Sequence, residues 1–263
     1  MGINMTVIGG ILAFCCGSVF GSFANVLIVR MKDASSLWGR SRCVHCKVNI
    51  RPHHLVPILS WFVLGGRCAD CKKPIHAQYP IVEFAGALLC LVAFLRHNPL
   101  LDARETYAFL FEFFFALDLL VLVAFDLRWR LLPIEFMIGS GFVFFLFRAL
   151  LMPNVFSVTS AMLGVVVGAG FLGAQVLISR GKWMGMGDPW AGALIGATLG
   201  WPLIAYVLYA TYIIGGIVAI FLFIGGFAKR GTRVPFAPFL AIGAMFAIWF
   251  GAQMDTIIGK MMS

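Results

Sequence analysis

Charged residues are scarce in this sequence. Only 12% of its 263 residues are Asp, Glu, Lys or Arg, against about a quarter in a typical soluble domain. Hydrophobic residues make up 61%, so a soluble globular fold is excluded. The 29 glycines and 26 phenylalanines suit helices that pack closely within a lipid bilayer. The composition therefore predicts an all-α, polytopic membrane protein.

The sequence also lacks a cleavable targeting signal. No basic residue precedes the first apolar run, and no small-residue cleavage site follows it, so we expect residues 1–30 to be retained as a transmembrane helix. Pro and Gly interrupt helices, and Gly200-Trp201-Pro202 divides the longest apolar run. We expect about eight transmembrane helices, one in residues 1–30 and seven in a catalytic region of residues 80–263. The expected spans are 5–29, 80–95, 107–125, 133–152, 156–178, 189–200, 202–228 and 235–258.

The net charge of +9 does not indicate nucleic-acid binding, because the basic residues form short clusters between apolar runs. Positive residues mark the cytoplasmic side of a membrane protein. Of the 20 basic residues, 16 lie in the odd-numbered connections. We therefore expect a cytoplasmic insert at 31–79, with both termini outside. The sixteen are Arg30, Lys32, Arg40, Arg42, Lys47, Arg51, Arg67, Lys72, Lys73, Arg128, Arg130, Arg180, Lys182, Lys229, Arg230 and Arg233.

Two CxxC pairs lie in the polar insert. Cys43 and Cys46 form the first pair, and Cys68 and Cys71 form the second after 21 intervening residues. Such turns aim two thiolates each at one tetrahedral zinc ion, and four thiolates close its coordination sphere. Two disulfides are the alternative, which a reducing cytoplasm disfavours. The spacing predicts a structural zinc site.

Acidic residues number only 11, and the predicted topology places Asp126 and Asp188 at one membrane face. Asp118 lies about 12 Å deeper along its helix and fits a meeting with Asp188 less well. Asp188 followed by Pro189 is also a good helix start, so a capping role stays open. Asp126 is the stronger indication of a functional site. An acid near a helix C-terminus is unfavourable because its charge opposes the helix dipole, so helix capping does not explain it.

Two carboxylates in one site can share a proton, so that one acts as an acid while the other activates water. This is the chemistry of an aspartic peptidase. Gly185 and Gly187 leave space where the backbone of an extended substrate could approach. Pro235 and Phe236 either line the same cleft or only end a loop.

The chain resembles the prepilin peptidases, the type IV leader peptidase family of GxGD-type membrane aspartic proteases. The resemblance is carried by several motifs spread over most of the chain. They are Gly21-Ser22-Phe23-Ala24-Asn25-Val26, the two CxxC pairs, Tyr79-Pro80-Ile81-Val82-Glu83, Asp126 seven residues before Pro133, Met184-Gly185-Met186-Gly187-Asp188, and Pro235-Phe236-Ala237-Pro238-Phe239.

The resemblance implies that Asp126 and Asp188 are the catalytic pair of an enzyme in the bacterial cytoplasmic (inner) membrane. It implies cleavage of prepilin or pseudopilin precursors on the cytoplasmic side, after a Gly that ends a short basic leader. It also implies N-methylation of the new terminus with S-adenosylmethionine. Ile134 and Pro189-Trp190 depart from the family pattern, and these departures bear on substrate preference rather than on the carboxylates.

Two other functions fit parts of the sequence. A multi-span transporter could use the acids to carry protons and a zinc-stabilised insert to bind a partner. However, the chain shows no inverted repeat, and its acids lie at one face rather than at the midplane. A protease with presenilin-like substrates is the third hypothesis, against which the cysteine insert argues.

Overall fold

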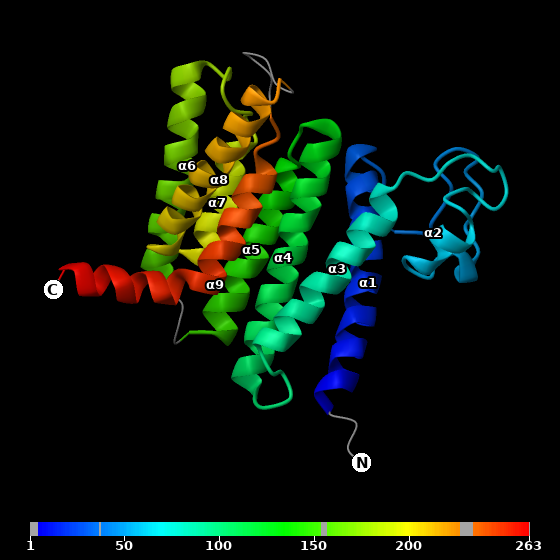
Figure 1. Ribbon diagram of the computed structural model, residues 1–263, viewed down its shortest axis with the longest axis horizontal. Helices are drawn as coiled ribbons and strands as arrows, with labels where there is room; N and C mark the ends of the chain where they lie inside the picture. Colours follow the sequence, from blue (N-terminus) through cyan, green and yellow to red (C-terminus); the bar gives the residue numbers. More distant parts are fainter. Residues whose placement is uncertain (1–4, 37, 154–156, 227–233, 263) are drawn as a thin grey trace. The chain divides into compact units, whose positions relative to one another are not determined.

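The computed structural model describes residues 5–36, 38–153, 157–226 and 234–262, without the side chains of 252 and 254–262. Over these residues the chain is helical, and its only strand-like pairings are two isolated bridges (Figure 1). The predicted all-α class is therefore confirmed. The helices are α1 (Met5–Lys32), the short 3-10 helix η1 (Pro52–His54), α2 (Leu59–Val63), α3 (Gln78–Arg96), α4 (Ala103–Trp129), α5 (Ile134–Leu151), α6 (Val158–Ser179), α7 (Asp188–Leu199), α8 (Leu203–Ile224) and α9 (Ala237–Met262).

Six of the described helices, α1, α3, α4, α5, α6 and α8, are long and apolar enough to cross a membrane. The described apolar part of α9, Ala237–Gly251, is shorter than these six helices. The predicted break near Gly200 is confirmed, since α7 ends at Leu199 and α8 begins at Leu203. The sixth expected span is shorter than a full transmembrane helix. With 12 residues, α7 is only about 18 Å long, against a hydrocarbon core of about 30 Å. The turn after α7 still reaches the start of α6, where the N–H of Trp201 donates to the carbonyl oxygen of Ser160 across 3.0 Å.

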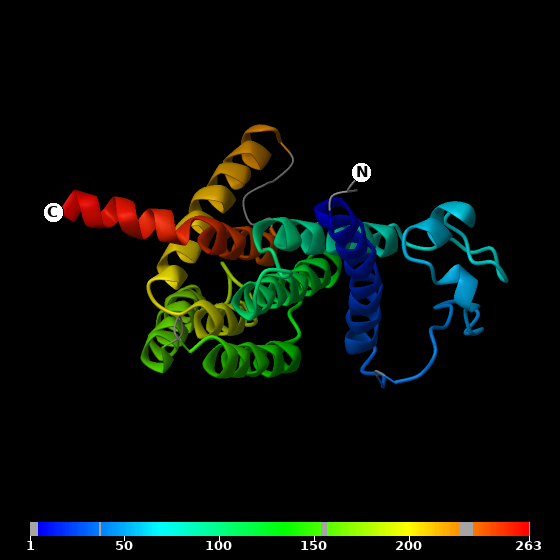
Figure 2. The same cartoon turned by 90° about the horizontal axis from the view of Figure 1, so that it is seen from below.

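The chain divides into two compact units, Met1–Ala124 and Phe125–Ser263, with the boundary inside α4. In the first unit α1 and α3 cross in close contact (Figures 1 and 2). A Cβ on Gly21 would lie 2.7 Å from the Cα of Glu83, and one on Gly86 would lie 2.8 Å from the carbonyl oxygen of Gly17. Only glycine allows this approach. Nearby, the buried Asn25 side chain donates to the carbonyl oxygen of Tyr79 across 3.0 Å.

In the second unit α7 is an interior helix. Eight of its residues are buried, including Asp188, Ile195 and Thr198. Glycines again allow close packing, here between α6 and α7. A side chain added at Gly168 of α6 or at Gly192 of α7 would meet the backbone of the other helix. At the other end of α7, Arg148 of α5 donates to the carbonyl oxygen of Thr198 across 2.6 Å. This contact satisfies a carbonyl that the helix end leaves open.

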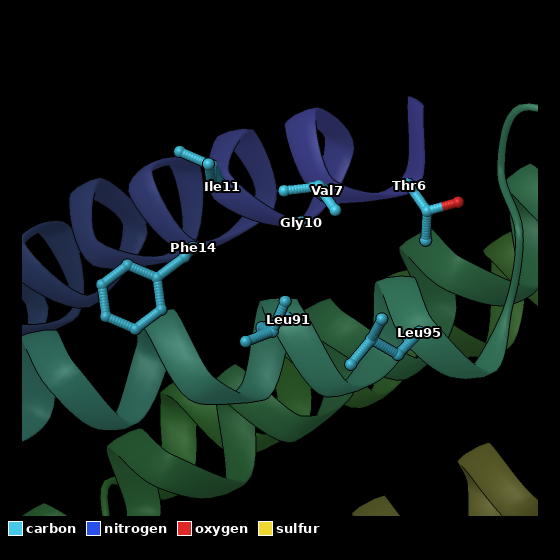
Figure 3. A pocket seen from close by; sticks show the side chains of 7 residues that line it. All are labelled: Thr6, Val7, Gly10, Ile11, Phe14, Leu91 and Leu95. Carbon is cyan, nitrogen blue, oxygen red and sulfur yellow. The ribbon is translucent and has the colours of Figure 1, made fainter. Parts of the chain in front are cut away.

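A pocket of about 430 Å³ lies between α1 and α3 (Figure 3). Its lining is apolar apart from one threonine and contains no titratable group. We therefore place the candidate functional sites elsewhere. The lining residues are Thr6, Val7, Gly10, Ile11, Phe14, Leu91 and Leu95.

Candidate active site and metal centre

Asp126 lies in the last turn of α4, and its side chain is held by another helix of the second unit. The residue is only 7% exposed. Its Oδ2 accepts a hydrogen bond from the backbone N–H of Ala237, the first residue of α9, across 3.0 Å. The first N–H groups of a helix have no partner within the helix, and its N-terminus attracts negative charge. Asp126 therefore opposes the dipole of its own helix but suits that of α9.

Asp188 is the first residue of α7 and is 6% exposed. The N-cap position belongs to Gly187, one residue earlier than the sequence suggested. The Asp188 side chain turns back, and its Oδ2 accepts the N–H of Gly185 across 2.8 Å. Asp188 thus closes the glycine loop, and the described structure gives it no capping bond to α7.

The two carboxylates share one region of the second unit. Asp188 is close enough to Asp126 to interact with its charge, and both groups are largely removed from water. Backbone N–H groups hold both carboxylates, those of Ala237 and Phe236 at Asp126 and that of Gly185 at Asp188, and lone pairs remain for water or substrate. Two like charges held together outside bulk water favour a single shared proton. This arrangement suits general acid and base catalysis.

The two glycines before Asp188 differ in their surroundings. Gly185 is exposed, and a Cβ there would lie 3.5 Å from Asp188 Oδ2, an ordinary contact. A Cβ on Gly187 would lie 2.8 Å from the Cβ of Leu132. The absence of a side chain at Gly187 is thus already required by packing. The predicted role of both glycines in admitting a substrate stays a prediction.

Pro235 and Phe236 directly precede the residue that bonds Asp126. Both are half-buried, and the Phe236 ring lies 6.0 Å from the ring of Tyr212 on α8. Tyr212 interacts electrostatically with Asp188 and donates to Gln175 Oε1 across 2.7 Å. An aromatic surface therefore borders the carboxylates. The predicted cleft role of Pro235 and Phe236 remains untested.

Sequence reasoning missed the N–H of Ala237 and the hydroxyl of Tyr212. One signal for the first was present: the start of α9 has no acid in its first turn, and Val234-Pro235-Phe236 supplies no capping side chain. A helix start without its own cap needs an acceptor from elsewhere. Tyr212 lies in a uniformly apolar run, and no comparable signal marks it.

The four predicted cysteine ligands come together in the insert. Their sulfur atoms all lie within 4.8 Å of one another, and Cys43 Sγ lies 3.9 Å from Cys71 Sγ. Tetrahedral zinc with bonds of about 2.3 Å separates its sulfurs by about 3.8 Å, so the thiols fit a zinc ion. All four are free cysteines, so the alternative of two disulfides is not seen.

Two similar turns hold these cysteines. The N–H of Lys47 donates to the carbonyl of Cys43, and that of Lys72 to the carbonyl of Cys68, each across 3.0 Å. Both lysines have a left-handed backbone, with φ of 60° and 59°. The sequence shows this duplication as Arg-Cys-x-x-Cys-Lys at residues 42–47 and 67–72, a repeat that sequence reasoning overlooked.

The thiols are poised to exchange protons for a metal. Burial raises the pKa of Cys43, but backbone hydrogen bonds from Cys46 and His45 outweigh it and lower the pKa to about 7. The Val48 backbone lowers the pKa of Cys46, yet burial and the neighbouring Cys43 raise it to about 11. One thiolate therefore forms readily, and its negative charge disfavours ionisation of the next thiol. A bound divalent cation would remove this repulsion.

Two family models match the chain. The Bacterial Peptidase A24 N-terminal domain matches residues 15–97, and the Type IV leader peptidase family matches residues 113–220. A prepilin leader peptidase/N-methyltransferase of Dichelobacter nodosus is 32% identical over 83% of this chain and 74% of its own length. This chain belongs to the type IV leader peptidase family.

Relatives in this family also include proteins of the same name from Pseudomonas putida and Bacillus subtilis. Each is 29% identical, and the matches cover 92% and 95% of this chain and 91% and 98% of those proteins. The N-terminal model contains the four cysteines, and the leader peptidase model contains Asp126 and Asp188. Pro235 and Phe236 lie beyond both. No solved structure shows a significant match to the chain.

Proposed function

We propose that this protein is a membrane aspartic endopeptidase that removes the leader from prepilin or pseudopilin precursors, with Asp126 and Asp188 as its catalytic pair. The observation that carries the proposal is the pair itself, two buried carboxylates that backbone N–H groups orient. Membership of the leader peptidase family supports the substrate class, and it disfavours the transporter hypothesis.

The reaction starts with one proton on the pair. The ionised carboxylate takes a proton from water as the water oxygen bonds to the carbon of the scissile peptide. The other carboxyl gives its proton to the carbonyl oxygen. When the C–N bond breaks, the amine leaves with the proton of one carboxyl. The other carboxylate takes a hydroxyl proton from the tetrahedral intermediate as its C=O bond re-forms, so the pair again holds one proton. Burial keeps both groups out of bulk water, where their interaction would be weaker.

The cytoplasmic membrane is the proposed location, with the insert and both aspartates facing the cytoplasm and both termini outside. The basic residues support this orientation, although Lys229, Arg230 and Arg233 lie outside the described residues. Residues 1–30, 31–79 and 80–263 would then be the first span, the zinc-binding insert and the catalytic region. Zinc bound to Cys43, Cys46, Cys68 and Cys71 would stabilise the insert, with no position open for catalysis.

Co-expression with a prepilin tests the peptidase. We expect Asp126→Asn and Asp188→Asn each to abolish processing, while Asp33→Asn, which changes an exposed acid in the insert, retains it. Membrane content and zinc content of each variant show whether it has folded. Normal processing by the Asp126→Asn or the Asp188→Asn variant would contradict the proposed catalytic pair.

A second activity, N-methylation of the new terminus with S-adenosylmethionine, is proposed from the names of the relatives. Mass spectrometry of the mature pilin N-terminus tests it directly. We expect the N-terminus of the mature pilin to carry one methyl group, which adds about 14 mass units to the chain. Unmodified termini would restrict the protein to cleavage.

A further inference from the structure

The small helix α2 of the insert presents an apolar face to its surroundings. Leu59, Phe62 and Val63 are 63%, 65% and 84% exposed. Trp61, between them, points the other way, and its Nε1 donates to the carbonyl of Ile75 across 3.2 Å. One side of α2 is therefore fixed to the insert, while the opposite side offers large apolar groups, which marks a contact surface.

A hydrogen bond sets the position of α2 along α3. The N–H of Ile58, just before α2, donates to Glu83 Oε2 across 2.7 Å. Both residues belong to the first unit, in which the insert lies to one side of α1 and α3 (Figure 1). Glu83 lies five residues into α3, about 8 Å from its start.

This depth places α2 at the membrane boundary. The 19 residues of α3 extend about 28 Å, which barely matches a hydrocarbon core of about 30 Å. The first turns of α3 must therefore lie where hydrocarbon meets headgroups. Since Glu83 is in the second turn and holds Ile58, α2 begins in the same zone.

The charge of the insert identifies the kind of membrane surface. Residues 30–73 contain nine basic and only two acidic residues. Arg67, Lys72 and Lys73 follow α2 closely and are exposed. Anionic lipid headgroups attract each such residue by about 1 kcal/mol near the surface. Apolar groups flanked by basic ones are typical of helices that lie in a bilayer interface.

We propose that α2 is an interfacial anchor, which inserts Leu59, Phe62 and Val63 among the headgroups of an anionic bilayer and docks the four-cysteine insert on the membrane surface. The bond between Ile58 and Glu83 fixes the depth of the anchor. The lysines and arginines after α2 then contact lipid phosphates. This inference does not depend on the peptidase activity or on which side the insert faces.

Hydrogen exchange of the full-length protein in nanodiscs tests the anchor. A helix of five residues opens readily by itself, so slow exchange of its amides reports docking. We expect the amides of residues 59–64 to exchange more slowly in discs that contain phosphatidylglycerol than in discs of phosphatidylcholine alone. Lys72→Gln and Lys73→Gln should each lower this added protection about fivefold.

Phe62→Ser with Val63→Ser should abolish the protection in both kinds of disc, and unchanged zinc content will show that the insert is intact. As a matched control, Val44→Ser changes an exposed apolar residue in the first cysteine turn and should leave exchange at α2 unaltered. A photoreactive benzoylphenylalanine at position 62 identifies the neighbour. Crosslinks to lipid are expected. Crosslinks to protein alone, or equal protection in both discs, would overturn the proposal.

Discussion

The carboxylate of Asp126 and the backbone N–H of Ala237 are joined by a buried hydrogen bond of 3.0 Å, although 111 residues separate them in the chain. The bond connects the end of α4 to the start of α9. It orients the carboxylate and satisfies a helix N–H that would otherwise be unpaired. One aspartate thus serves a structural purpose and a proposed catalytic one.

Ala237→Pro removes this N–H at a helix position where proline is normally tolerated. A hydrogen bond to a charged group contributes about 1.5–3 kcal/mol, so we expect the rate of precursor cleavage to fall about 10- to 100-fold. Ala237→Gly keeps the N–H and should cleave at a rate close to that of the parent. Equal rates for the two variants in a detergent assay would show that the bond does not support catalysis.

Gly187→Ala would place a Cβ 2.8 Å from the Cβ of Leu132. Overpacking of this kind costs about 1–3 kcal/mol, and here it would displace the loop that carries Asp188. We expect a lower melting temperature and slower cleavage. Adding Leu132→Ala should restore part of both, because it removes the opposing atoms. Gly185→Ala, where only an ordinary contact arises, is the control for packing and should keep the melting temperature of the parent. A loss that Leu132→Ala does not relieve would favour a direct role for Gly187 with substrate.

Metal analysis of the purified protein should find about one zinc per chain, since four thiols fit one tetrahedral ion. Cys46→Ser should lose the metal and expose the insert to proteolysis, because structural zinc supplies the folding free energy of such small regions. Cys15→Ser, which changes an exposed thiol on α1, should retain it. Full zinc content in the Cys46 variant would exclude the four-cysteine site.

Side-chain chemistry explains what the sequence could predict. Cys43, Cys46, Cys68 and Cys71 are recognisable because their spacing alone brings two thiols to each turn. Asp126 and Asp188 stand out because carboxylates are costly beside hydrocarbon. The close packing of Gly21 against α3 was also foreseeable, since small residues allow helices to approach.

Other features depend on contacts that composition does not encode. Hydropathy cannot separate residues that face lipid from residues that face another helix, so the interior helix α7 resembled a full span. The donor from Ala237 is a backbone group, and any residue except proline could supply it. Leu132 explains Gly187 only after the loop between α4 and α5 has been placed beside it.

The packing of α6 against α7 gives the most direct link between helix packing and the proposed active site. A Cβ on Gly168 would meet the backbone of Gly192, whereas one on Gly170, two residues further along α6, would meet nothing within 4 Å. Backbone atoms cannot move aside as a flexible side chain can, so Gly168→Ala must push the two helices apart. Since α7 begins with Asp188, we expect slower cleavage together with a lower melting temperature. Gly170→Ala should match the parent in both and even gain slightly in helix propensity. If the two variants behave alike, the contact between α6 and α7 does not position the proposed catalytic carboxylate.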